Sequence, residues 1–149
     1  MVESSCTFPS ELSQLTALRS FLDTACRRAW GVDADDERLC QLELAVHEAA
    51  TNIIRHAYQG QPGKPIHLLV ETDGETARVT LSHYGRDFDP DAVPAPDFEG
   101  NRFGGFGLYL IGQLVDEVTY TRDDEGRHGI RLFTRRKPSQ EATAAKTQS

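Results

Sequence analysis

The stretch from about residue 33 to Tyr58 constrains the fold most, because it reads as one long amphipathic helix. Acidic residues open it, as the positive end of a helix dipole favours. At 100° per residue its apolar side chains fall on one stripe, which is typical of a helix that covers a core. The stripe consists of Leu39, Leu42, Val46, Ala49, Ile53 and Ala57. We therefore expect the helix to bury this face.

Glu48 and Asn52 lie one turn apart on a different face of the same helix. A face of this kind is usually solvated, and that interpretation stays open here. Asparagine is a weak helix former, however, and the small neighbours Ala45 and Thr51 leave room for a ligand. Glu48 could act as a general base. Asn52 could supply an oxygen to Mg²⁺, which takes its other ligands mostly from phosphates and water.

The rest of the chain alternates between helix and hairpin patterns. A helix over 10–30 has Ser10 as its predicted N-cap and Gly31 as its C-terminal stop. Turn residues at 73–74 and 124–126 are flanked by β-rich runs, which predicts two hairpins. The predicted order is a strand at 5–10, the helix at 10–30, the long helix, a hairpin at 66–85, an irregular loop at 85–105, a helix from 105 and a hairpin at 116–136.

This order predicts an α+β fold, a two-layer sandwich in which helices cover one face of a mostly antiparallel sheet. The chain has 149 residues, which suggests one domain, and we place it at residues 1–137. Residues 138–149 are small and polar, so we expect them to form a disordered tail.

Composition argues against several classes of function. The net charge is −7 and no basic stripe is present, which argues against direct nucleic-acid binding. No apolar run reaches membrane-spanning length and the N-terminus lacks a signal-peptide pattern, so we expect a cytoplasmic protein without a membrane anchor. The three cysteines fit neither a disulfide framework nor a zinc site. The HEAAT sequence at 47–51 lacks the second histidine of a zinc-protease helix.

Glycines mark two further candidate segments. Gly104, Gly105 and Gly107 stand where a helix begins, and a helix N-terminus that allows close backbone approach suits a phosphate. Arg102 beside them could pair with the same anion. Gly85 follows a strand and leads into the long loop. Glycine before a helix is common, so this pattern alone is weak evidence.

Three blocks of sequence together resemble the bacterial anti-sigma-factor serine kinases, which are Bergerat-fold (GHKL) ATPases. The blocks are AVHEAATNIIRHAY at 45–58, HYGRDFDP at 83–90 and GGFGLYLIGQLVDEVTY at 104–120. They occur in the family's order and with fitting spacing, and the similarity spans about residues 5–136. The resemblance implies the Bergerat fold, with ATP and Mg²⁺ as cofactors.

The resemblance also implies a role for individual residues. Glu48 matches the base that activates a serine hydroxyl, and Asn52 matches the Mg²⁺ ligand. Gly85 matches the glycine beneath the adenine. Gly105 and Gly107 match the glycines on the phosphate side of the site.

One position departs from the family pattern. The family normally has an aspartate two residues before this glycine, where its carboxylate accepts a hydrogen bond from the adenine amino group, and this chain has His83. A neutral imidazole can accept one hydrogen bond but lacks the second oxygen that would organise a water on the base. Loss of a charge-assisted hydrogen bond would cost about 1.5–3 kcal/mol of binding free energy.

The predicted function is that of an ATP-dependent serine/threonine-protein kinase and anti-sigma-type regulator. The resemblance implies partner switching: a STAS-type antagonist is phosphorylated, a sigma factor is sequestered, the protein is a homodimer, and it does not itself touch DNA. The alternative is a non-catalytic module of the same fold that sequesters a partner and has a weakened nucleotide site. A detached histidine-kinase ATPase domain is a third interpretation, disfavoured because the chain shows no dimerisation helix with a phosphorylatable histidine.

Overall fold

The computed structural model describes residues 1–31, 36–86 and 106–136. Its elements are β1 (Val2–Pro9), the 3₁₀ turn η1 (Leu12–Gln14), α1 (Leu15–Trp30), α2 (Glu37–Asn52), the π-helical turn η2 (Ile53–Ala57), β2 (Pro65–Thr72), β3 (Thr76–His83), α3 (Phe106–Leu114), β4 (Glu117–Arg122) and β5 (His128–Arg135). The predicted order of strands, helices and hairpins is confirmed over these ranges. Within them, no helix is both long enough and apolar enough to cross a bilayer.

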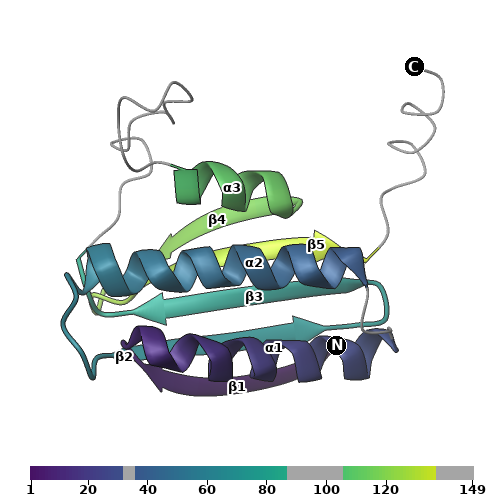
Figure 1. Cartoon of the computed structure of the whole chain (residues 1–149), viewed down its shortest axis with the longest axis horizontal. Helices are drawn as coiled ribbons and strands as arrows, with labels where there is room; N and C mark the ends of the chain where they lie inside the picture. Colours follow the sequence, from purple (N-terminus) through teal and green to yellow (C-terminus); the bar gives the residue numbers. More distant parts are fainter. Residues whose placement is uncertain (32–35, 87–105, 137–149) are drawn as a thin grey trace.

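The strands form one antiparallel sheet in the order β1-β2-β3-β5-β4. Figure 1 shows α1, α2 and α3 side by side on one face of this sheet, with α1 over β1 and β2 and α2 over β3 and β5. The molecule is thus the two-layer α+β sandwich that the sequence predicted.

The core lies between these two layers. Side chains of β2 alternate strictly between buried and half-buried, as a strand with one covered face requires. Ile66, Leu68 and Val70 face the helices, and their neighbours in β3 and β5 extend the same apolar surface. The whole predicted stripe of the long helix is buried against it. The prediction of the core face of α2 is therefore confirmed.

The structure confirms the predicted C-terminal end of α1 but not its predicted N-cap. Gly31 ends the helix in the left-handed conformation, with φ 62°, as predicted. Ser10 is not the N-cap, because η1 intervenes before α1 begins. Its hydroxyl donates to the Gln61 carbonyl at 2.7 Å and accepts from the Lys64 amide at 2.9 Å. Ser10 therefore joins the end of β1 to the loop that precedes β2.

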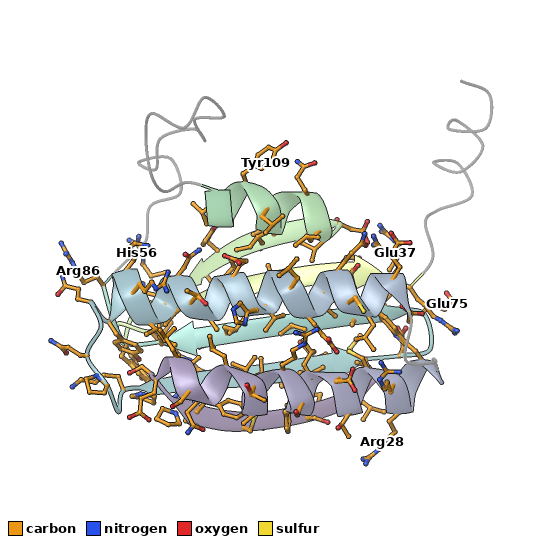
Figure 2. The ribbon with its side chains drawn as sticks, in the orientation of Figure 1. Arg28, Glu37, His56, Glu75, Arg86 and Tyr109 are labelled. Atoms are coloured by element: carbon orange, nitrogen blue, oxygen red, sulfur yellow. The ribbon has the colours of Figure 1, made fainter. Side chains whose placement is uncertain are left out.

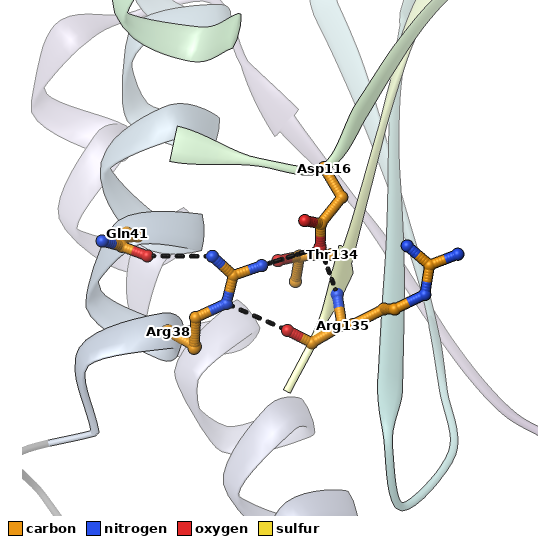
Figure 3. Close-up of polar contacts among 5 residues, drawn as sticks. All are labelled: Arg38, Gln41, Asp116, Thr134 and Arg135. Atoms are coloured by element: carbon orange, nitrogen blue, oxygen red, sulfur yellow. Dashed lines mark hydrogen bonds and ion pairs between the residues drawn. The ribbon is translucent and has the colours of Figure 1, made fainter. Parts of the chain in front are cut away.

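A network centred on Arg38 fixes the N-terminal end of α2 to the C-terminal end of β5 (Figure 3). The guanidinium donates to the Asp116 carboxylate at 2.7 Å, to the Thr134 hydroxyl at 2.7 Å and to the Arg135 carbonyl at 3.0 Å. Asp116 also accepts from the Arg135 amide at 2.7 Å. Asp116 lies between α3 and β4. The network therefore joins the start of α2, the end of β5 and the connection from α3 to β4.

A buried carboxyl group lies at the contact between α1 and α2. Glu43 is 5% exposed, and its Oε2 accepts from Arg19 at 3.0 Å. Burial, and then a hydrogen bond with Asp23, raise the pKa of Glu43 to about 7. The same hydrogen bond, with Arg27, lowers the pKa of Asp23. The buried Oε1 has no donor among the described residues, which fits a protonated Glu43 that donates to the Asp23 carboxylate.

We predict that Arg38→Ala lowers the free energy of unfolding by about 1–3 kcal/mol, because it removes the charged partner of Asp116 and the side-chain donor to the Arg135 carbonyl. Arg38→Lys keeps the charge but loses the planar fork, so its loss should be smaller but still measurable. Arg28→Ala, on the exposed face of α1 (Figure 2), is the control and should change the free energy by less than about 0.5 kcal/mol. Urea unfolding measures all three, and equal stability of the Arg38 and Arg28 variants would contradict a bracing role.

We also predict that the contribution of Glu43 to stability falls as pH rises from about 5 to 8. The folded-state pKa of Glu43 lies above its usual value of 4.5, so in this window the folded chain keeps a proton that the unfolded chain has released. The expected loss is of the order of 1–3 kcal/mol. Glu43→Gln should remove this contribution, so its stability relative to the native chain should rise with pH over this window, whereas the exposed Glu37→Gln should follow the native profile. Denaturant midpoints at five pH values measure this, and an unchanged slope in Glu43→Gln would show that another group titrates.

Candidate functional site

The candidate residues gather at one end of the sandwich. The last turns of α2, the end of β3 and the first turn of α3 lie at this end in Figure 1. Figure 2 places the exposed side chains of His56 and Arg86 there as well. The Arg38 network lies at the opposite end of α2. The hydrogen bonds that fix the helix and the candidate site residues therefore lie at different ends of it.

Glu48 and Asn52 are both half-buried on α2, which packs against α3. Across the described ranges, neither side chain has a hydrogen bond or ion pair. A half-buried carboxylate and amide without protein partners are accessible to water and equally to a ligand. The ligand-facing interpretation of this helix face therefore stays a prediction beside the solvated one.

The helix changes its geometry directly after Asn52. The predicted single helix to Tyr58 is α2 followed by the π-helical turn η2, in which the Tyr58 amide donates to the Ile53 carbonyl at 2.9 Å. Single π-turns within α-helices often occur at functional sites. Here the turn brings the end of the helix onto the end of β3.

Gly85 lies where this helix end meets the sheet. The Arg86 amide donates to the Ala57 carbonyl at 2.9 Å. A Cβ at position 85 would lie 2.6 Å from that carbonyl oxygen, a distance that real Cβ atoms do not adopt. Close backbone packing therefore requires glycine here, whatever ligand lies nearby.

His83 ends β3 on the helix-covered face and is 4% exposed. Its Nδ1 accepts from the Gly85 amide at 3.1 Å. The ring packs edge-on against Tyr58, with centroids 5.7 Å apart, and lies 5.8 Å from the ring of His128. Burial, and then the nearby His128, lower the pKa of His83 to about 4. The imidazole is therefore neutral at pH 7.

Sequence reasoning missed two residues that hold His83 in place. The Tyr58 hydroxyl donates to the Pro65 carbonyl and accepts from the Tyr84 amide at 2.9 Å, so it clamps the start of β2 to the end of β3. His128 is the direct cross-strand partner of His83. Aligning the two hairpins by their apolar alternation could have found His128, but nothing in the sequence marks Tyr58.

The glycine-rich segment is only partly described. Gly107 lies in the first turn of α3, as predicted. Arg102, Gly104 and Gly105 lie outside the described residues, so their predicted phosphate-side roles stay predictions.

Comparison with known proteins decides the family. A family model described as the histidine kinase-like ATPase domain matches residues 8–132. The serine-protein kinase RsbW of Staphylococcus epidermidis is 33% identical over 125 residues, which cover 77% of this chain and 76% of that protein. The chain belongs to the anti-sigma-factor serine kinase family.

Two further similarities agree with this membership. The anti-sigma F factor of Anoxybacillus flavithermus is 26% identical over 103 residues, which cover 64% of this chain and 68% of that protein. The crystal structure of the RsbU and RsbW domains of Rv1364c from Mycobacterium tuberculosis matches with a TM-score of 0.63 at 17% identity. That match covers 91% of this chain and 32% of the other, and it supports the fold alone.

This family implies a nucleotide and Mg²⁺ in the site. The described residues fit Mg²⁺ at Asn52, but they do not fit adenine at His83. The unpartnered amide oxygen of Asn52 is a suitable hard ligand for Mg²⁺. His83 cannot accept a hydrogen bond from adenine as an aspartate would. The only acceptor nitrogen of its neutral ring, Nδ1, already accepts a hydrogen bond from the Gly85 amide.

We predict that Gly85→Ala lowers the free energy of unfolding by about 1–3 kcal/mol, because the new Cβ collides with the Ala57 carbonyl. Gly112→Ala in α3 is the matched control, since nothing lies within 4 Å of its added Cβ. Removing a glycine from a helix interior should stabilise this variant by about 0.5–1 kcal/mol. Thermal and urea unfolding compare the two, and equal effects would rule out the close contact as the reason for Gly85.

Proposed function

We propose that this protein is a nucleotide-dependent serine protein kinase and anti-sigma-type regulator. The observation that carries the proposal is the pair Glu48 and Asn52, half-buried on one face of α2 and without protein partners among the described residues. The names of the relatives, serine-protein kinase RsbW and anti-sigma F factor, support the same role.

In this proposal Glu48 is the catalytic base. Its carboxylate accepts the proton of a serine hydroxyl on the substrate protein as that oxygen becomes the nucleophile, and it later releases the proton to solvent. Asn52 holds Mg²⁺ through its amide oxygen. A Mg²⁺–nucleoside triphosphate, which is ATP in the family resemblance, would supply the phosphoryl group and leave as the nucleoside diphosphate.

The remaining candidate residues position the nucleotide. Gly107, with Gly104, Gly105 and Arg102, would hold the phosphates at the start of α3, where backbone amides and the helix dipole favour an anion. Gly85 and His83 would lie beside the base. The base and the phosphates are thus held by different elements, β3 and α3.

The proposed partners are a STAS-type antagonist, which is the phosphorylation substrate, and a sigma factor, which is sequestered. The names of the relatives support an anti-sigma role, and the net charge of −7 disfavours a direct contact with DNA. We propose that the protein works as a homodimer, as the family resemblance implies. Light scattering at high concentration tests this, and a monomer would count against it.

One observation favours a second candidate function. His83 brings no negative charge to the position where the family normally has a carboxylate, so the base end of the site would bind adenine more weakly. The protein would then sequester its partner without catalysis. Partner binding that is the same with and without any nucleoside triphosphate is the result expected of such a module.

We predict that Glu48→Gln lowers phosphoryl transfer to a STAS-domain protein by about 10²–10⁴-fold, because the amide cannot accept the hydroxyl proton. Binding of nucleotide and partner should persist, since the variant is isosteric. Glu37→Gln, at the exposed start of the same helix (Figure 2), should transfer at the native rate. Transfer of labelled phosphate from ATP or GTP measures this, and native-rate transfer by Glu48→Gln would mean that Glu48 is not the base.

A further inference from the structure

The ring of His83 has a fixed pattern of hydrogen-bonding groups. A backbone amide can only donate, so the 3.1 Å contact from the Gly85 amide makes Nδ1 the acceptor. A neutral imidazole has one donor and one acceptor nitrogen, so its proton lies on Nε2. His83 therefore offers a donor from Nε2 and no free acceptor.

Neighbouring groups hold this pattern in place. The Tyr58 ring and the His128 ring pack against the imidazole from η2 and β5. Tyr58 is itself fixed by hydrogen bonds to Pro65 and Tyr84. A flip of the ring would lose the Gly85 hydrogen bond and leave that amide without its acceptor, which opposes the exchange of donor and acceptor.

Purine bases differ in what they present at position 6. Adenine carries an amino group there, which donates hydrogen bonds, whereas guanine and hypoxanthine carry a carbonyl oxygen, which accepts them. A carboxylate beside this position accepts from the adenine amino group. An Nε2–H group in the same place cannot form a hydrogen bond with the amino group of adenine, because both groups are donors. It can donate a hydrogen bond to the carbonyl oxygen of guanine or hypoxanthine.

We propose that His83 sets the base specificity of the nucleotide site, and that the site prefers 6-oxopurine nucleotides, those of guanine and hypoxanthine, to adenine nucleotides. The inference rests on the proposed function, because it takes the base to lie beside His83 and Gly85. It goes beyond that function by naming the class of base and the residue that selects it.

The test is calorimetric titration of the full chain with the Mg²⁺ complexes of ATP, ITP and GTP. ITP is the most informative probe, because its base differs from adenine only in the 6-oxo group and the proton on N1. The variant His83→Asp replaces the donor by an acceptor. His67→Asp is the matched control, because it makes the same change on the opposite face of the sheet, where His67 contacts Thr7. Thermal unfolding of each variant checks that it is folded.

We expect ITP and GTP to bind the native chain about 10- to 100-fold more tightly than ATP, which corresponds to one gained hydrogen bond and one relieved donor–donor contact. His83→Asp should reverse this order, and His67→Asp should keep it. Binding that is equal, or tighter for ATP, in the native chain would overturn the base preference and leave the kinase proposal standing.

Two other outcomes separate the inference from the proposed function. If no nucleotide binds the native chain but ATP binds His83→Asp, the inference is wrong and the sequestering function is favoured. If no nucleotide binds either folded protein, the nucleotide site itself is wrong, and both the inference and the kinase proposal fail.

Discussion

The packing of α2 against the sheet is the constraint on which the rest of the structure depends. Its apolar stripe is buried in full, so the rotation of the helix about its axis is fixed. That rotation turns Glu48 and Asn52 away from the sheet, to a half-buried position where they have no protein partners among the described residues. The packing of the core therefore orients Glu48 and Asn52. At the other end of α2, the Arg38 network ties the helix to β5 and to Asp116.

The junction between η2 and β3 fixes the backbone around Gly85. The π-turn places the Ala57 carbonyl where the Arg86 amide can reach it, and this approach excludes any side chain at position 85. Tyr58 then ties the start of β2 to the end of β3. The glycine that the resemblance assigns to the base is thus also required by the fold, so its presence alone does not demonstrate nucleotide binding.

Periodicity in the sequence was enough to predict the fold, because the stripe of α2 and the alternation in the hairpins report directly on which faces are buried. Glu48 and Asn52 were singled out on other grounds, because asparagine is a weak helix former with small neighbours and because both residues match the family motif. Tyr58, Glu43 and the π-turn were not predictable in this way. Their roles come from contacts between residues distant in the chain, such as Glu43 with Arg19, which leave no local pattern.

His83 differs from an aspartate in what it requires of its surroundings as well as in what it offers a ligand. A carboxylate buried beside the rings of Tyr58 and His128 would need a compensating charge or several hydrogen-bond donors. The neutral imidazole needs only the Gly85 amide and the ring packing that it already has. Because His83 lies on β3 while Glu48 and Asn52 lie on α2, a change at the proposed base position would leave the residues proposed for phosphoryl transfer in place.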